Sequence, residues 1–475
     1  MNTKKLMMTG ALVATLSATG CASVQAGMGF DEVWRTVEER TGKRVHWNQG
    51  TPADKAVEDE VSALLKEELS VEAAVQIALL NNRSLQATYE ELNIAQADLV
   101  AAGLLRNPVF DAEVRFPTKG GGTGLEMAVV QDFIDILYIP LRKSVAEAAF
   151  EAAKLRVAGA AIDLAGQVRA AFYAAQASKQ LLEMRMNVVA ATEAAYTLAT
   201  RLRVAGNITE LDIANERALF EQSKLDLRTA ELELLRSRER LNVLVGLWGN
   251  QTNWTMPARL PDPSSEEPNT MGLERRAVER SLDLAIARAE IDEAAQALGI
   301  ARPFGLFSDA ELGVTSEREG DGAWAVGPAF SLPLPIFNQG QPAVASAQAT
   351  LRSISQQYAA QATELRSQVR VAHAAVTAAR ERVVYYEQVV LPLRQQIVDQ
   401  TQFRYNAMQV GAFQLLQAKK EQIETGSEYI RALLEYWLAH TEREQLLNGR
   451  MTSFEGMGDM NDESSSESTS GEGDH

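Results

Sequence analysis

The chain has 475 residues, a formal net charge of −17 at pH 7 and a single cysteine. The surplus negative charge argues against nucleic acid or an acidic membrane surface as a partner, and one cysteine excludes an intrachain disulfide and a paired-cysteine metal motif. Abundant alanine, few aromatic residues (6%) and only 14 prolines favour long, closely packed helices.

The N-terminus has the layout of a secretory signal peptide, which we place at residues 1–20. Lys4 and Lys5 precede a mostly apolar run over 6–18, which is too short and too interrupted by glycine to span a membrane as a helix. Small residues then lead to Cys21, which resembles the cysteine that is acylated in bacterial lipoproteins. By the same resemblance Ala22 favours the outer membrane, whereas the alternative is ordinary secretion with a chance cysteine.

Residues 21–69 are mixed and polar, and we expect an N-terminal arm with a short helix over 30–41. From the capping residue Ser70, apolar positions recur at three- and four-residue steps and predict a helix over 70–106, which Asn107 and Pro108 end. The period then changes from 3.6 to 2 and predicts a hairpin over 107–133 with an apolar and a charged face. Such strands suit a transmembrane barrel, although a half-exposed strand of a soluble sheet has the same pattern.

A proline-free stretch over 141–245 predicts two long helical legs joined by one turn at Gly206. The first leg would be roughly 95 Å long at ~1.5 Å per residue. The second leg ends before Gly246, which can close a helix in a left-handed conformation. Residues 250–270 contain four prolines and are predicted to be a linker.

The same order of elements then repeats. Short motifs that begin at Asn82, Asp111 and Gln167 return at Glu279, Asp309 and Gln368. The second repeat, 271–449, therefore predicts helices over 271–302 and 342–447, with a kink at Pro392, and a hairpin over 306–332 whose loop is 317–322. Residues 450–475 are expected to form a disordered acidic tail.

The expected fold is mainly α with a small β part, in two tandem repeats of helix, β-hairpin, long helix and helix. Four membrane-type strands cannot close a barrel, and an open edge in hydrocarbon would leave backbone groups unpaired at several kcal/mol each. About eight strands make the smallest closed barrel, so the strands require two or more copies of the chain.

The sequence resembles the TolC-like outer-membrane efflux family, in its lipoprotein branch. The resemblance covers about residues 69–449 and rests on the paired tips at 204–212 and 408–416, on the segment 332–337 before Gly340, and on 247–249. It implies a homotrimer with an α-helical barrel and a 12-stranded transmembrane β-barrel, located in the outer membrane and extending into the periplasm. It also implies a periplasmic adaptor (membrane fusion) protein and an inner-membrane pump of the resistance-nodulation-division (RND) type as partners, besides outer-membrane lipid.

The resemblance further implies that the adaptor docks at the tips, where the matching residues are Gly206, Leu211, Gly411 and Leu416. It implies an aspartate near the closed periplasmic aperture, which is Asp212 here, while the second repeat offers Gln417 at the matching distance from its glycine. Two alternatives remain open. The glycines can be turn residues only, and Asp212 can be a first-turn acid that complements the helix dipole.

The charged strand face supplies the candidate pore-lining residues Asp111, Glu113, Asp309 and Glu311, which would keep a pore wet and favour cations; the alternative is a solvated surface. The aromatic residues Phe110, Phe116, Trp324 and Phe330 suit lipid contact and the membrane interface. No catalytic, metal or cofactor site is predicted. The glycine-rich loop 120–124 lacks the lysine of a phosphate loop, and the four histidines have no paired metal spacing.

The expected function is an outer-membrane exit duct of a tripartite RND-type efflux system, which passively conducts small molecules or metal ions from the periplasm to the exterior. One alternative is the outer-membrane duct of a type I protein secretion system. Another is a structural coiled-coil surface protein without a pore. The duplicated hairpins argue against the last, because a fibre needs no alternating membrane strands.

Overall fold

The computed structural model describes residues 26–116, 118, 122–132, 135–264, 272–304, 311–318, 322–332, 334 and 336–452. The predicted signal peptide, Cys21, Asp309 and the acidic tail beyond 452 lie outside these residues. The described chain is mainly helical with one small sheet, as predicted, and divides into two compact units. One unit comprises Met1–Asp31, Glu90–Lys154 and Ile286–Gln357, and the other comprises Glu32–Tyr89, Leu155–Ala285 and Tyr358–His475.

The N-terminal arm contains α2 (Phe30–Thr41) and α3 (Pro52–Leu64), of which only the first was expected from the sequence. The single helix expected over 70–106 is two helices, α4 (Val71–Asn81) and α5 (Arg83–Ala102). Asn82, with ψ 120°, separates them because its side chain replaces helical hydrogen bonds. Its Oδ1 accepts the Leu85 N–H at 2.8 Å, and its Nδ2 donates to the Leu244 carbonyl at 2.8 Å.

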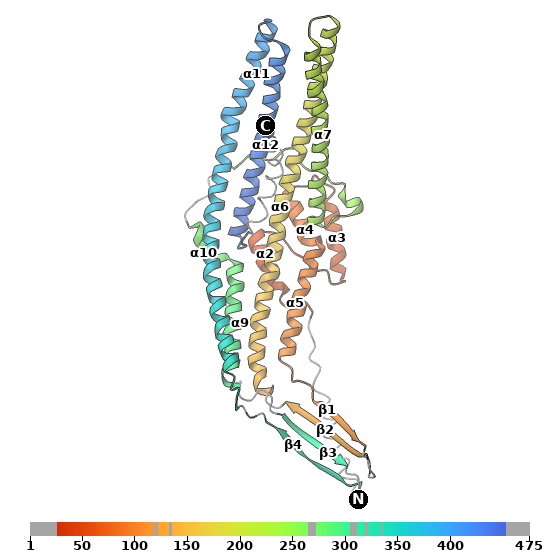
Figure 1. Ribbon diagram of the computed structural model, residues 1–475, viewed down its shortest axis with the longest axis vertical. Helices are drawn as coiled ribbons and strands as arrows, with labels where there is room; N and C mark the ends of the chain where they lie inside the picture. The colour runs from red at the N-terminus through yellow and green to blue at the C-terminus, as the bar shows by residue number, and fades with distance from the viewer. Residues whose placement is uncertain are drawn as a thin grey trace, which may run out of the picture. The chain divides into compact units, whose positions relative to one another are not determined.

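The first long leg is α6 (Asp135–Val204), a helix of 70 residues, and the return leg is α7 (Glu210–Val245). α6 starts earlier than predicted and includes Pro140, which removes one backbone hydrogen bond near the start of the helix. Figure 1 shows the yellow-green end of α6 running antiparallel beside α7. None of the helices in the described ranges has an apolar stretch long enough to cross a bilayer.

The second repeat has the same order of helices. α8 (Leu273–Arg280) and α9 (Leu282–Phe304) replace the one helix expected over 271–302. Ser281 separates them as Asn82 separates α4 and α5, with ψ 120° and with its Oγ accepting the Leu284 N–H at 3.1 Å. α4 packs against α7, and α8 packs against α12 (Ala412–Leu447) in the same way.

The descending leg of the second repeat consists of α10 (Gln341–Tyr385), a π-helical turn (Tyr386–Val390) and α11 (Leu391–Asn406). The π-helical turn stands beside Pro392, where a kink was predicted. The Leu391 N–H donates to the Tyr386 carbonyl, five residues back. This wider turn accommodates the proline, whose ring nitrogen cannot donate a hydrogen bond.

The sheet has four antiparallel strands in the order β1-β2-β3-β4. They are β1 (Val109–Arg115), β2 (Gly124–Asp132), β3 (Glu311–Arg318) and β4 (Trp324–Ser331). Glu317 and Arg318, which the sequence analysis assigned to the second hairpin loop, belong to β3. Because β2 pairs with β3, the hairpins of the two repeats form one sheet. Within the described residues, β1 and β4 are edge strands.

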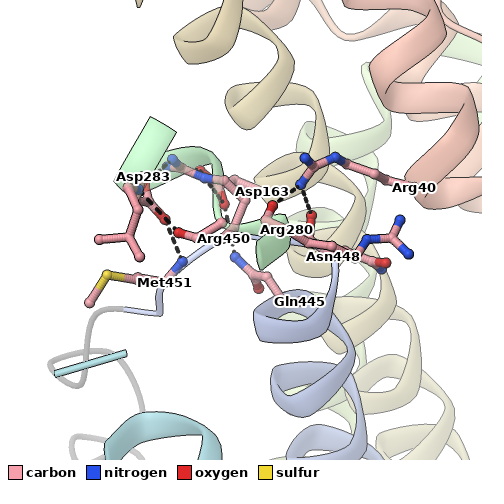
Figure 2. Close-up of polar contacts among 10 residues, drawn as sticks. Arg40, Asp163, Arg280, Asp283, Gln445, Asn448, Arg450 and Met451 are labelled. Atoms are coloured by element: carbon pink, nitrogen blue, oxygen red, sulfur yellow. Dashed lines mark hydrogen bonds and ion pairs between the residues drawn. The ribbon is translucent and has the colours of Figure 1, made fainter. Parts of the chain in front are cut away.

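An arginine after α12 joins the two repeats within the larger unit (Figure 2). Arg450 binds Asp163 of α6 in a bidentate pair, with Nε–Oδ1 at 3.0 Å and Nη2–Oδ2 at 2.6 Å, and it also binds Asp283 of α9. The Met451 N–H donates to the second Asp283 oxygen at 2.7 Å. Gly159 makes room for the guanidinium, since a Cβ there would lie 3.0 Å from Arg450 Nη1.

Candidate functional site

The tip between α6 and α7 is closed by a left-handed glycine. Gly206 has φ +78°. Its N–H donates to the Arg203 carbonyl at 2.9 Å, and the Asn207 N–H donates to the Leu202 carbonyl at 2.9 Å. This Schellman arrangement satisfies the last carbonyls of a helix. A Cβ at Gly206 would meet no heavy atom within 4 Å, so the backbone conformation alone favours glycine.

Asp212 is bound into the start of α7. Thr209 Oγ accepts the Asp212 N–H at 3.2 Å, while Asp212 Oδ2 accepts the Thr209 N–H at 2.8 Å and the Thr209 hydroxyl at 2.7 Å. The two hydrogen bonds that the carboxylate accepts, first that of the Thr209 hydroxyl and then that of the Thr209 N–H, lower the pKa of Asp212. These contacts form a capping box. The Asp212 carboxylate therefore caps α7, which is the alternative to a role at the aperture that the sequence left open.

The second tip has the same backbone path with different residues. Met408, with φ +58°, takes the left-handed position, and its N–H donates to the Tyr405 carbonyl at 2.9 Å. Gly411 was expected to permit this turn. It instead has φ −83° and ψ 167°, the same backbone angles as Thr209, the N-cap residue of α7. Met408 is therefore the counterpart of Gly206, and Gly411 is the counterpart of Thr209.

This alignment also changes the counterpart of Asp212. The Gly411 N–H donates to Gln414 Oε1 at 2.9 Å, just as the Thr209 N–H donates to Asp212. Gln414, rather than Gln417, therefore takes the place of the aspartate. Gln417 donates to Glu421 Oε1 at 3.0 Å, one turn further along α12.

Large apolar side chains are exposed at both tips. Leu211 is 68% exposed in the first turn of α7, and Phe413 is 55% exposed at the same position of α12. Met408, in the turn itself, is 93% exposed. Leu416, which the sequence analysis paired with Leu211, is half-buried. Sequence reasoning missed Met408 and Phe413 because it aligned the tips on their glycines rather than on the helix starts that follow.

The strand register places all acidic residues of the four strands on one face of the sheet. Asp111, Glu113 and Glu311 lie on this face, as predicted from the alternation. Glu113 pairs with Glu126, and Glu126 pairs with Glu317, so three glutamates form a row across β1, β2 and β3. This row was not predicted from the sequence, because the alternation of apolar and charged residues is less regular over 124–132 and because Glu317 was assigned to a loop.

Arg115 bridges this glutamate row. Its guanidinium lies 3.0 Å from Glu113 Oε1, 2.6 Å from Glu126 Oε2 and 3.7 Å from Glu317 Oε1. These side chains are between 32% and 62% exposed. The cluster is therefore an accessible charged surface rather than a buried ion pair.

The opposite face of the sheet is apolar and exposed. Phe110 pairs with Val129, which pairs with Val314, and these three side chains are each about half exposed or more. The four aromatic residues expected to face lipid are all on this face or at its edge, with exposures of 64% for Phe110, 77% for Phe116, 52% for Trp324 and 66% for Phe330. One face is thus suited to hydrocarbon and the other to water.

Two of the three described histidines, His46 and His440, have structural surroundings. His46 Nε2 lies 2.7 Å from Asp54 Oδ1. His440 packs against Tyr436 and Trp437, and burial, followed by the charge of Arg443, lowers the pKa of His440. Among the described residues, no three His, Cys, Asp or Glu side chains are grouped so that they could hold a metal ion.

Comparisons with known proteins find relatives among membrane channels. No family model matches the chain. In sequence it is 23% identical over 394 residues to the cobalt-zinc-cadmium resistance protein CzcC of Cupriavidus metallidurans, a match that covers 80% of this chain and 90% of CzcC.

Two solved structures have a similar fold. The outer membrane channel CmeC of Campylobacter jejuni matches with a TM-score of 0.66 and 14% identity, over 81% of this chain and 86% of CmeC. The open state of the outer membrane channel MtrE of Neisseria gonorrhoeae matches with a TM-score of 0.65 and 17% identity, over 80% of this chain and 89% of MtrE.

Proposed function

Since the chain has the fold of the TolC-like outer-membrane channels, we propose that it is the outer-membrane exit duct of a tripartite RND-type efflux system. The observation that carries the proposal is the sheet. It has one exposed apolar face, one acidic face and two edge strands, as a segment of a larger transmembrane barrel would have.

Assembly of several copies would remove the sheet edges. An unpaired strand edge in hydrocarbon costs several kcal/mol for each backbone group, so β1 of one copy is expected to pair with β4 of the next. A homotrimer gives a 12-stranded barrel. Small side chains suit its inner face, and Ala128, Gly313, Gly327 and Ala329 are indeed on the acidic side of the sheet.

The remaining parts of the proposal follow the same architecture. Cys21 is proposed to carry the lipid anchor at the outer membrane, and Asp212 to lie near the periplasmic aperture while it caps α7. The tips around Gly206, Leu211, Gly411 and Leu416 are proposed to dock a periplasmic adaptor, which links the duct to the inner-membrane pump. The exposed Met408 and Phe413 extend this proposed docking surface.

Divalent metal ions are the favoured cargo. CzcC is named for resistance to cobalt, zinc and cadmium, and the acidic face of the sheet is suited to cations rather than anions. These two observations favour metal efflux over protein secretion. The paired membrane-type hairpins argue against a coiled-coil surface protein without a pore.

Reconstitution of the purified full-length protein tests the proposal. We expect a trimer by mass measurement in detergent and single-channel conductance in planar bilayers. Cells that lack the endogenous duct should regain tolerance to cobalt, zinc or cadmium when they express the chain. A monomer without conductance under any opening condition would refute the duct.

A further inference from the structure

The row formed by Glu113, Glu126 and Glu317 is the level of the acidic face with the most carboxylates. The next row along the sheet contains Asp111, Ala128, Thr315 and Gly327, with one carboxylate among four residues. The glutamate row lies close to the hairpin turns, since β1 ends at Arg115 and β2 begins at Gly124. In a duct whose helices extend into the periplasm, the hairpin turns are at the outer mouth.

Arg115 is the only cation on the acidic face within the described strand residues. Its guanidinium lies within 4 Å of a carboxylate on each of three strands, so one positive charge faces three negative charges. The row therefore has a net charge of −2 in each chain. Without Arg115 the net charge would be −3, and with one glutamate neutralised it would be −1.

We propose that Arg115 is a selectivity-determining residue: it sets the charge of a glutamate ring at the outer mouth of the pore, and thereby the preference of the pore for cations. This inference rests on the proposed duct, in which the acidic face lines a water-filled lumen. A ring of carboxylates raises the local cation concentration and repels anions, and the guanidinium limits both effects. A partly neutralised ring attracts cations without binding them so tightly that they stop.

Reversal potentials across planar bilayers test this role. The KCl concentrations on the two sides differ but stay near 10 mM, where the Debye length is about 30 Å. At this low ionic strength, charges on the wall of the pore act on ions across the lumen. Arg115→Gln is expected to raise the cation-to-anion permeability ratio at least about twofold. This estimate is the Boltzmann factor for an ion that passes roughly 10 Å from one unit charge in water. Glu126→Gln is expected to lower the ratio, and Arg115→Lys to leave it near the wild-type value.

Arg318 provides the matched control. It is at the end of β3 and pairs with Leu125 and Trp324, on the opposite face of the same sheet. Arg318→Gln removes the same charge from the same end of the sheet, and it should leave the ratio unchanged. If Arg115→Gln fails to assemble, Glu126→Gln tests the inference instead, because it should shift the permeability ratio in the opposite direction.

The outcomes separate the inference from the proposed function. Conducting pores whose ratio is unchanged in both Arg115→Gln and Glu126→Gln would overturn the role of Arg115 and leave the duct intact. Equal shifts in Arg115→Gln and Arg318→Gln would also overturn it, because they would reflect general surface charge. Wild-type protein that inserts without conducting would overturn the duct, and the inference with it.

Discussion

Met408 and Gly206 have the same backbone position at the two helical tips, but only glycine adopts this conformation without a steric penalty. An L-residue in the left-handed region costs about 1–2 kcal/mol, because Cβ approaches the following carbonyl. Met408 is the one non-glycine residue with positive φ in the described part of the chain, and its side chain is 93% exposed. So exposed a side chain gains little packing against the described residues to offset this strain, and we infer that it has a functional role.

The strain predicts that Met408→Gly stabilises the protein. Relief of about 1–2 kcal/mol is partly offset by the greater freedom of glycine in the unfolded chain, about 0.5–1 kcal/mol. We expect a net gain near 0.5–1 kcal/mol, seen as a higher midpoint of thermal unfolding. Gly206→Ala is the matched control and should lower the midpoint, although its Cβ meets no atom within 4 Å. A lower midpoint for Met408→Gly would contradict the strain.

At the scale of elements, periodicity predicted the type and order of the helices and strands from residue 70 onward, but it predicted neither α3 nor the breaks at Asn82 and Ser281. The breaks at Asn82 and Ser281 depend on side-chain hydrogen bonds that compete with the helix, and the apolar pattern continues through both positions. The glutamate row depends on strand register, which alternation within each strand does not determine. The acidic face was therefore predictable, whereas the residues that meet on it were not.

In each repeat the C-terminal end of a short helix meets the C-terminal end of the return leg: α4 meets α7, and α8 meets α12. The hydrogen-bond donor at this junction differs between the two repeats. In the first repeat Asn81 Nδ2 donates to the Gly246 carbonyl at 2.7 Å. In the second repeat the N-terminal arm supplies the donor, because Arg40 Nη1 binds the carbonyls of Arg280 at 2.6 Å and Asn448 at 2.7 Å (Figure 2). The C-terminal end of α2 thus contacts the second repeat, although α2 precedes the first repeat in sequence.

This exchange of donors predicts that Arg40→Ala destabilises the protein. Loss of the guanidinium leaves two partly buried carbonyls without this donor, at a cost of about 1–3 kcal/mol. The measurement is the midpoint of chemical unfolding, followed by helical circular dichroism. Arg44→Ala is the control, since Arg44 is 58% exposed and its ion pair with Glu60 is on the surface. Equal midpoints for the two variants would contradict a structural role for Arg40.

At the scale of the whole molecule, the internal repeat predicted a duplicated architecture, and the sheet shows how the two copies are joined. β2 of the first repeat pairs with β3 of the second along its length, from Leu125 with Arg318 to Asp132 with Glu311. The repeats nevertheless differ at their tips. The first tip has a glycine turn and an aspartate cap, while the second has Met408 and Gln414.

The proposed docking role predicts a loss of export when the apolar tip residues become charged. Leu211→Asp with Phe413→Asp should abolish metal tolerance in cells that depend on this duct, while the trimer and its conductance persist. The control is Glu210→Gln, whose side chain is 77% exposed in the same turn and contributes no apolar surface. Tolerance that survives the double substitution would exclude these two residues from docking.

The pairing of β2 with β3 has a consequence for the stoichiometry of a complex. A ring built from single-repeat subunits would present the same tip at every position, so a partner would find equivalent sites. When two repeats share one sheet and one polypeptide, the sequence of each tip can change without the other. The tips of this chain do differ, with Gly206 in the turn of the first and Met408 in the turn of the second. A trimer of this chain would therefore offer three sites of each of two kinds, and the number of partners bound would depend on whether a partner distinguishes them.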